Sequence, residues 1–239
     1  MSKGLLEPDA ALKAPRTFGV VDHFVGLNSA IWTSTLTDSG TAAVGDEVGG
    51  VVTLSPSDGT VADNDEAYVA TKKIFKILVG KPIALAARTQ FAQAATNAAN
   101  VFVGLMNAMT ANALQDNGAG PKADFSGAGF FAKDGSTSLF VIYSDGTTQT
   151  IAELTATNTV NKLAYLAASA DFQLLEIDIV PKTSTLVDVA FRVNGVTVYK
   201  MLDRTYANAT EISAGLGVKN GTAAQQTLRA DFFACNQSV

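Results

Sequence analysis

Charged residues are scarce in this sequence. Of its 239 residues, 16% are Asp, Glu, Lys or Arg, whereas soluble domains usually have about 25%. The 17 basic residues are outnumbered by 22 acidic ones, and their densest group is only Lys72, Lys73 and Lys76. Nucleic-acid binding needs clustered basic side chains and is therefore not expected. So few charges favour a protein whose surface is largely covered by neighbouring subunits.

Cysteine, histidine and tryptophan each occur once, which limits the chemistry open to the chain. With Cys235 alone no intrachain disulfide can form, and a buried, inert thiol is expected. With His23 alone a zinc site made of several histidines is excluded, and we expect a strand or interface residue. Loop residues such as Asp116 and Asn117 form no compact cluster with calcium-ligand spacing. We expect no metal site and no cofactor.

Long hydrophobic runs are also missing. No segment approaches the roughly 20 apolar residues of a membrane span, and the N-terminal residues lack the apolar core of a secretory signal. We therefore expect no membrane association, and synthesis in the cytoplasm without export. Residues 1–16 show little periodicity and are predicted to form an N-terminal arm, whereas residues 17–239 are predicted to form one domain.

Alternation of apolar and polar residues is what the sequence does have. Between Phe172 and Met201, three alternating runs are separated by a Pro-Lys-Thr-Ser break and by Asn194-Gly195. Alternation is typical of strands with one face in a core, and Asn-Gly favours a type I′ hairpin turn. We predict an antiparallel meander here. Similar runs predict strands at 18–25, 31–36, 49–55, 66–71, 73–78, 83–91, 101–106, 125–133, 139–144, 149–154, 212–218 and 226–234.

Three segments interrupt this pattern. Residues 92–100 are rich in Ala, Asn and Gln and are predicted to form a short helical turn or a loop. Residues 107–122 have no strand character, and residues 155–168 are ambiguous. Short strands with frequent turn signals and no alternation of strands with helices predict an all-β sandwich.

The last third of the chain resembles a known superfamily. The order LLEIDIV, VDVAFRVNGVTVYK, EISAGLGVKNG and LRADFFACN resembles the concanavalin-A-like jelly-roll superfamily, which includes legume lectins, laminin-G-type modules and laminarinase-type glucanases. This resemblance implies a jelly-roll β-sandwich of two antiparallel sheets. A fold of this kind does not by itself imply an activity.

The composition and the absence of a signal peptide also resemble jelly-roll proteins of tailed-bacteriophage virions, of the head cement or decoration type. This second resemblance implies a non-enzymatic structural protein on the capsid surface. Its partners would be the major capsid protein and copies of itself, a trimer being one arrangement. We expect Leu5, Leu6 and Leu12 of the arm to contact capsid subunits.

The strand that contains Glu176 and Asp178 is similar to the catalytic strand of laminarinase-type glucanases, written E-x-D-x-(x)-E. The final Glu, which would be the acid/base of a retaining mechanism, is replaced by Val180 or Pro181, according to the form of the motif. We therefore expect no catalytic site. The two carboxylates are predicted to face solvent and to pair with Arg192 and Lys200 on nearby strands.

A carbohydrate-binding module, for example a receptor-binding or tail-fibre domain, is the alternative hypothesis. It would use the concave sheet and the loop at 107–122. Trp32 and Tyr143 are the candidate residues for stacking against a sugar, although a core or interface position is also expected for Trp32.

Overall fold

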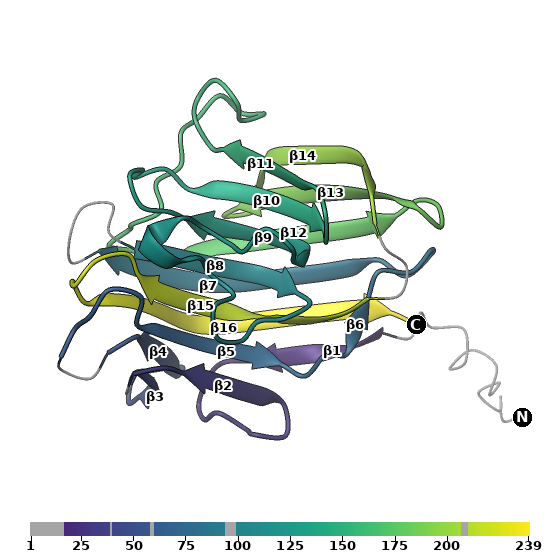
Figure 1. The fold of residues 1–239 in the computed structure, drawn as a ribbon. Coiled ribbons are helices and arrows are strands. Elements are labelled where there is room, and N and C mark those ends of the chain that lie inside the picture. The colour runs from purple at the N-terminus through teal and green to yellow at the C-terminus, as the bar shows by residue number, and fades with distance from the viewer. Residues whose placement is uncertain (1–16, 39, 58–59, 94–98, 207–209) are drawn as a thin grey trace, which may run out of the picture.

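The computed structural model describes residues 17–38, 40–57, 60–93, 99–206 and 210–239. Their strands form two antiparallel sheets stacked face to face (Figure 1). Within these ranges the helical content is one 3₁₀ turn at Asp116–Gly118, and no helix is long and apolar enough to cross a membrane. The predicted all-β sandwich of two antiparallel sheets is confirmed.

The first sheet contains the predicted meander. Its strands lie in the order β14–β13–β12–β7–β16–β4–β3, and β1 pairs with the other end of β16. The strands are β1 (Thr17–Asp22), β3 (Thr41–Gly45), β4 (Val51–Ser55), β7 (Ile83–Gln93), β12 (Gln173–Pro181), β13 (Leu186–Val193), β14 (Val196–Thr205) and β16 (Gln226–Ser238). Buried and partly exposed residues alternate along β12 and β13, so one face lies in the core and the other faces solvent.

The second sheet has the order β11–β10–β9–β8–β15–β5–β2, and β6 pairs with one end of β15. The strands are β2 (Trp32–Leu36), β5 (Glu66–Thr71), β6 (Phe75–Lys76), β8 (Ala99–Met106), β9 (Ser126–Ala132), β10 (Phe140–Asp145), β11 (Gln149–Glu153) and β15 (Glu211–Asn220). In β5, β10 and β15 nearly every residue is buried. This sheet is therefore covered on both faces.

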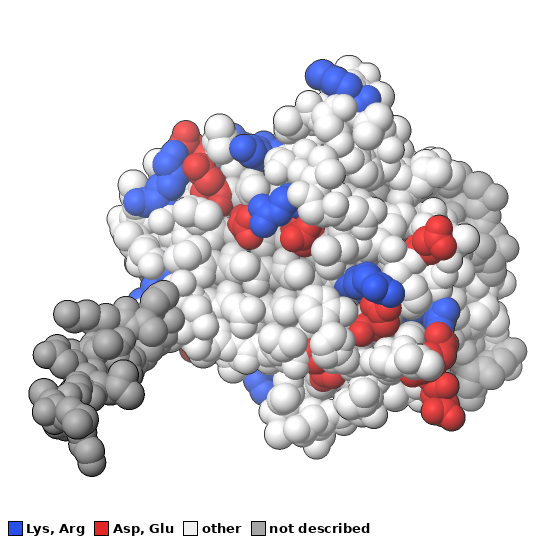
Figure 2. All heavy atoms as spheres, turned by 180° about the vertical axis from the view of Figure 1, so that it is seen from behind, with Lys and Arg blue, Asp and Glu red and all other residues white. Residues whose placement is uncertain are grey.

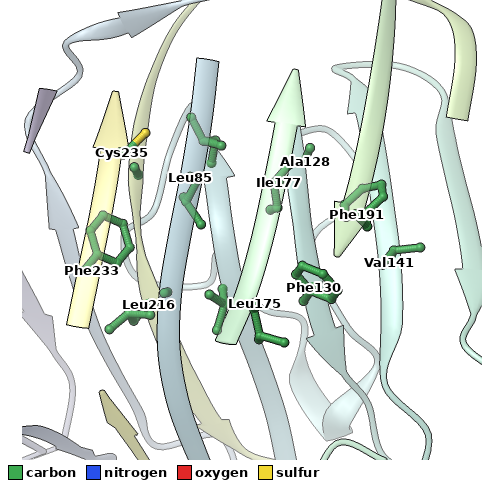
Figure 3. Close-up of a cluster of buried hydrophobic side chains, with 14 of the residues drawn as sticks. Leu85, Ala128, Phe130, Val141, Leu175, Ile177, Phe191, Leu216, Phe233 and Cys235 are labelled. Carbon is green, nitrogen blue, oxygen red and sulfur yellow. The ribbon is translucent and has the colours of Figure 1, made fainter. Parts of the chain in front are cut away.

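The core between the sheets is filled by side chains from both of them (Figure 3). Phe191 of β13 meets Phe130 of β9 edge to face, with ring centroids 5.4 Å apart. The inward face of β13, which is Val187, Val189, Phe191 and Val193, is buried throughout. Burial of apolar area at about 25 cal/mol per Å² makes this layer the main stabilising element of the fold.

A segment at residues 107–125, which we call the cover segment, packs over the outer face of the second sheet. It closes a second apolar cluster, composed of Tyr68, Ala70, Phe102, Met106, Met109, Ala113, Leu114, Phe125, Phe131, Phe140 and Ile142. The cover explains why residues 101–106 form a continuous apolar run without alternation, because both faces of that strand are buried.

The hairpin between β13 and β14 has the predicted turn, since Asn194 and Gly195 have φ values of 51° and 78°. Strand β3 was not predicted, because its sequence TAAVG has small residues and no alternation. Strand β1 ends before residue 25 because Phe24 adopts a φ of 52°. Strands β7 and β8 extend into the segment at 92–100 that was predicted to be a loop or helical turn.

Candidate functional site

The solvent face of the first sheet is the broad open face of the sandwich. Figure 2 views the molecule from behind Figure 1, and in it blue and red side chains lie together in mixed groups separated by wide uncharged areas. Ion pairs of the first sheet and its turns include Arg88–Asp231 and Lys182–Asp203. The charges on this face are therefore largely neutralised by their neighbours.

Glu176 and Asp178 lie on this face and share one arginine. The register of β12 and β13 places Glu176 opposite Arg192. The guanidinium lies 3.8 Å from Glu176 through Nε and hydrogen-bonds Asp178 through its terminal nitrogen. The hydrogen bond with Asp178 is the main cause that raises the pKa of Arg192. The predicted pairing with Arg192 is confirmed, whereas Lys200 lies opposite Ala190 and has no ion pair among the described residues.

The same face has no third carboxylate on β12. Val180 is two residues beyond Asp178 and is 46% exposed, whereas Pro181 is buried. A retaining glycosidase needs a second carboxyl group about 5–5.5 Å from the nucleophile. Val180 cannot supply a proton, so β12 by itself does not form the acid/base pair that hydrolysis of a glycoside requires.

A hollow of about 430 Å³ opens near the other end of this face. It is lined by His23, Val48, Gly49, Arg88, Leu174, Asp231 and Phe232. His23 follows directly after β1, and its ring lies on Phe232 with centroids 5.2 Å apart. Arg88 and Asp231 form an ion pair of 2.6 Å. Among the described residues, the buried Oδ1 of Asp231 has no hydrogen-bond partner.

Phe172 lies between two arginines beside this hollow. Arg88 and Arg229 are 5.4 Å and 5.6 Å from the ring centroid, within the range of a cation–π contact. Arg229 also donates to Gln90 at 2.8 Å and pairs with Glu47. The sequence did not predict this group, because its members come from four distant parts of the chain.

Trp32, a candidate for sugar stacking, is only 3% exposed. Its ring packs against Phe24 and Phe233, with centroids 5.5 Å and 5.2 Å away. Its indole N–H donates to Asp22 at 2.6 Å. Since neither ring face is open to a ligand, the stacking hypothesis for Trp32 is corrected in favour of a core anchor.

Tyr143, the second stacking candidate, is 2% exposed. Its hydroxyl donates to the carbonyl oxygen of Thr205 at 2.8 Å, and burial raises the pKa of the phenol well above its ordinary value. It borders a smaller hollow of about 210 Å³ together with Asp145 and Arg204. Its ring belongs to the core between the sheets, so it too is corrected to a core residue.

The loop at 107–122 was expected to join the concave sheet in a sugar site, but it lies over the second sheet as part of the cover segment. A buried ion group holds it there. Lys219, 1% exposed, lies 3.5 Å from Glu66 and 2.7 Å from Asp116, and donates to the Leu114 carbonyl at 3.2 Å. The hydroxyl of Tyr68 donates to Glu66 at 2.6 Å. Asp116, considered above as a loop metal ligand, is thus the partner of a lysine.

Two further expectations concern metals and the arm. The described residues contain no group of three or more His, Cys, Asp and Glu side chains that could hold a metal ion. Cys235 is fully buried, as expected, and burial raises the pKa of its thiol. Leu5, Leu6 and Leu12 lie outside the described residues.

The chain is similar to known proteins in its three-dimensional structure but not in its sequence. No protein-family model and no curated protein sequence matches the chain. The Emp46p carbohydrate recognition domain, in its potassium-bound form, has a TM-score of 0.56 and 12% identity over 90% of this chain and 94% of its own.

Two other solved structures are similar to a comparable degree. The endo-1,3-beta-glucanase of Streptomyces sioyaensis has a TM-score of 0.57 and 14% identity over 93% of this chain and 96% of its own. SO2946 of Shewanella oneidensis MR-1, a protein of unknown function, has a TM-score of 0.57 and 15% identity over 100% of this chain and 97% of its own. At these identities the similarity concerns the fold. The chain has the concanavalin-A-like sandwich fold of lectins and glucanases.

Proposed function

We propose that this chain is a non-enzymatic structural protein that works by packing against other protein subunits, as a cement or decoration protein of a bacteriophage head. The observation that carries this proposal is the distribution of exposed apolar side chains. Within the described ranges, eleven of the sixteen large exposed apolar residues lie along two opposite edges of the sandwich.

The first of these surfaces, the β2–β3 edge, is formed by the last strand of each sheet on one side together with β1 and the loops beside them (Figure 1). Its exposed apolar residues are Val21, Val25, Leu36, Val44 and Val48. The second, the β11–β14 edge, is formed by the last strands on the other side and the segment at 155–168. Its exposed apolar residues are Ile151, Val160, Leu163, Leu166, Val196 and Leu202.

Apolar edges of this kind support subunit packing, because exposed apolar groups lose contact with water when they are covered. The paired charges on the open face support the absence of enzymatic activity. Arg192 binds both carboxylates of β12, so Glu176 is not a free nucleophile. The low charge content of the sequence, 16%, agrees with a surface that neighbours cover.

Counting the protein in particles tests this proposal. Intact virions produced by the genome that encodes the chain should contain it in hundreds of copies, measured by mass spectrometry against the major capsid protein. Removal of residues 1–16 should prevent incorporation while the circular dichroism of the sandwich stays unchanged. Absence from particles, or a handful of copies as in a tail, would contradict the cement function.

Carbohydrate binding is a second candidate, and the hollow at His23 favours it. An aromatic wall at Phe232 beside a carboxylate and a guanidinium is a combination suited to a sugar ring with its hydroxyl groups. The Emp46p domain, with the same fold, is a carbohydrate recognition domain.

A glycan array tests this candidate. Selective binding should be lost in Phe232→Ala and in Asp231→Asn, and should be kept in Val180→Ala, which is exposed elsewhere on the same face. Trp32→Ala is not a suitable test, since it would remove a core side chain. An array without selective binding would contradict a lectin function.

A further inference from the structure

We propose that the β2–β3 edge of one copy binds the β11–β14 edge of a second copy, so that the protein associates with itself head to tail. This inference rests on the proposed structural function and adds the identity of one partner and of the two surfaces that meet.

Each edge ends in strands that are paired on one side only. Within the described residues, β3 pairs with β4 and β2 pairs with β5, and on the opposite side β14 pairs with β13 and β11 with β10. Their outer backbone groups can pair with another strand, which makes edges natural sites of strand addition. Part of the β14 edge is already occupied, because the Val160 N–H donates to the Val198 carbonyl at 2.9 Å. The end of β11 is partly occupied too, because the Glu153 carbonyl accepts from the Thr155 N–H at 3.0 Å and from the side-chain amide of Asn158 at 3.2 Å.

The two edges differ in charge. Residues 17–71, which form most of the β2–β3 edge, contain eight Asp and Glu residues and no Lys or Arg. Of these, Asp38, Asp46, Glu47 and Asp63 are exposed, and Glu47 is paired with Arg229. Lys72 reaches the end of β2, where it donates to Thr33 at 3.0 Å, so the edge is acidic on balance rather than uniformly.

The β11–β14 edge has exposed basic side chains instead. Lys162 and Lys200 are exposed, and Arg204 is half-buried. The exposed acidic residue Asp203 is paired with Lys182 at 2.7 Å, and Glu153 of β11 is half-buried. The three basic groups outnumber this remaining carboxylate, so the balance of this edge is positive.

This difference decides between two kinds of self-association. A symmetric contact between two β2–β3 edges would place acidic groups against acidic groups, and two β11–β14 edges would place basic against basic. A contact between unlike edges places opposite charges together around apolar side chains. Such a heterologous contact continues from copy to copy and gives a ring or an open row.

Analytical ultracentrifugation of the full-length chain tests the contact. The wild type should associate as its concentration rises, and more weakly at higher ionic strength. Val44→Lys, which faces a basic partner edge, and Leu163→Glu, which faces an acidic one, should each weaken association by roughly tenfold or more. Val79→Lys, at an exposed valine between β6 and β7 that belongs to neither edge, should behave as wild type. Unchanged circular dichroism shows that each variant is folded.

Mixing the two weakened variants gives the decisive result. Each keeps one native edge, so an equimolar mixture should form complexes of two or more copies under conditions where either variant alone is monomeric. No restoration on mixing, or a dimer sensitive to only one of the two substitutions, would indicate a symmetric contact and overturn the inference. A wild type that stays monomeric at all concentrations would also overturn it. The copy number in virions tests the proposed structural function independently of this self-association.

Discussion

Lys219 is a single charged residue held almost wholly inside the molecule, 1% exposed, between β15 and the cover segment. Removal of one member of a buried ion pair usually costs about 3–5 kcal/mol, because the other charge is left uncompensated. We expect Lys219→Met to lower the free energy of unfolding by that amount, measured by urea denaturation. Lys200→Met removes an exposed lysine and should change it by less than about 0.5 kcal/mol. Equal effects of both would contradict this account of the cover segment.

Asp145 makes the stability of the chain depend on pH. Burial raises the pKa of this carboxyl group, but hydrogen bonds from Thr148, Thr205 and Thr147 outweigh it and lower the pKa from 3.8 to about 2. The folded-state value is below the unfolded one. The stabilisation that the Asp145 carboxylate contributes to the folded state is therefore fully present above about pH 4 and is lost as the pH falls through 2.

We expect Asp145→Asn to unfold more easily than wild type by about 1 kcal/mol at neutral pH, a figure reduced for solvent screening. The difference should shrink toward zero between pH 4 and pH 2. Urea denaturation of both proteins across this range measures it. A difference that is constant with pH would rule out the carboxylate charge as its origin.

Contacts between side chains could be predicted from the sequence only where the two residues lie on strands that follow each other in the chain. The pairing of Glu176 with Arg192 was predictable because both residues lie on adjacent strands of one meander. The pairing of Lys219 with Glu66 and Asp116 was not, since more than 100 residues separate the lysine from each partner. Trp32 and Tyr143 were ambiguous for a related reason, because an aromatic residue in a strand can face either the core or a ligand.

At the scale of an element, the hairpin between β13 and β14 depends on one backbone conformation. Gly195 has a φ of 78°, and a methyl group added there would meet no atom within 4 Å. Any loss on Gly195→Ala is therefore due to the backbone, and we expect about 1–2 kcal/mol in thermal or urea unfolding. Gly26 also has free space but no positive φ, so Gly26→Ala is the matched control and should be neutral or slightly stabilising.

Most strands were predictable from alternation, and the exceptions have physical causes. Strand β3 is an edge strand of small residues, so it carries no core-facing pattern. The cover segment has the composition of a loop. Its apolar residues Met109, Leu114 and Phe125 pack on the outer face of the second sheet, and their spacing in the sequence does not indicate this. Its place over that sheet depends on contacts with residues far away in the sequence.

At the scale of the whole molecule, one core joins both sheets, so we expect a single unfolding transition. Two probes can follow it. Trp32 lies in the core near β1, and Cys235 lies in β16 with a fully buried thiol. Tryptophan fluorescence and the reactivity of Cys235 toward a thiol reagent should change at the same urea concentration. Two separate midpoints would mean that parts of the sandwich unfold independently.

The cover segment gives the molecule a front and a back. Its own chain shields the outside of the second sheet, whereas the outside of the first sheet is bare. In hydroxyl-radical footprinting, side chains beneath the shield would stay unmodified whether or not the protein is in an assembly. A change in oxidation on assembly would therefore come from side chains on the outer face of the first sheet or on the two edges of the sandwich. The pattern of protected residues would then show which face of each copy is turned toward the shell.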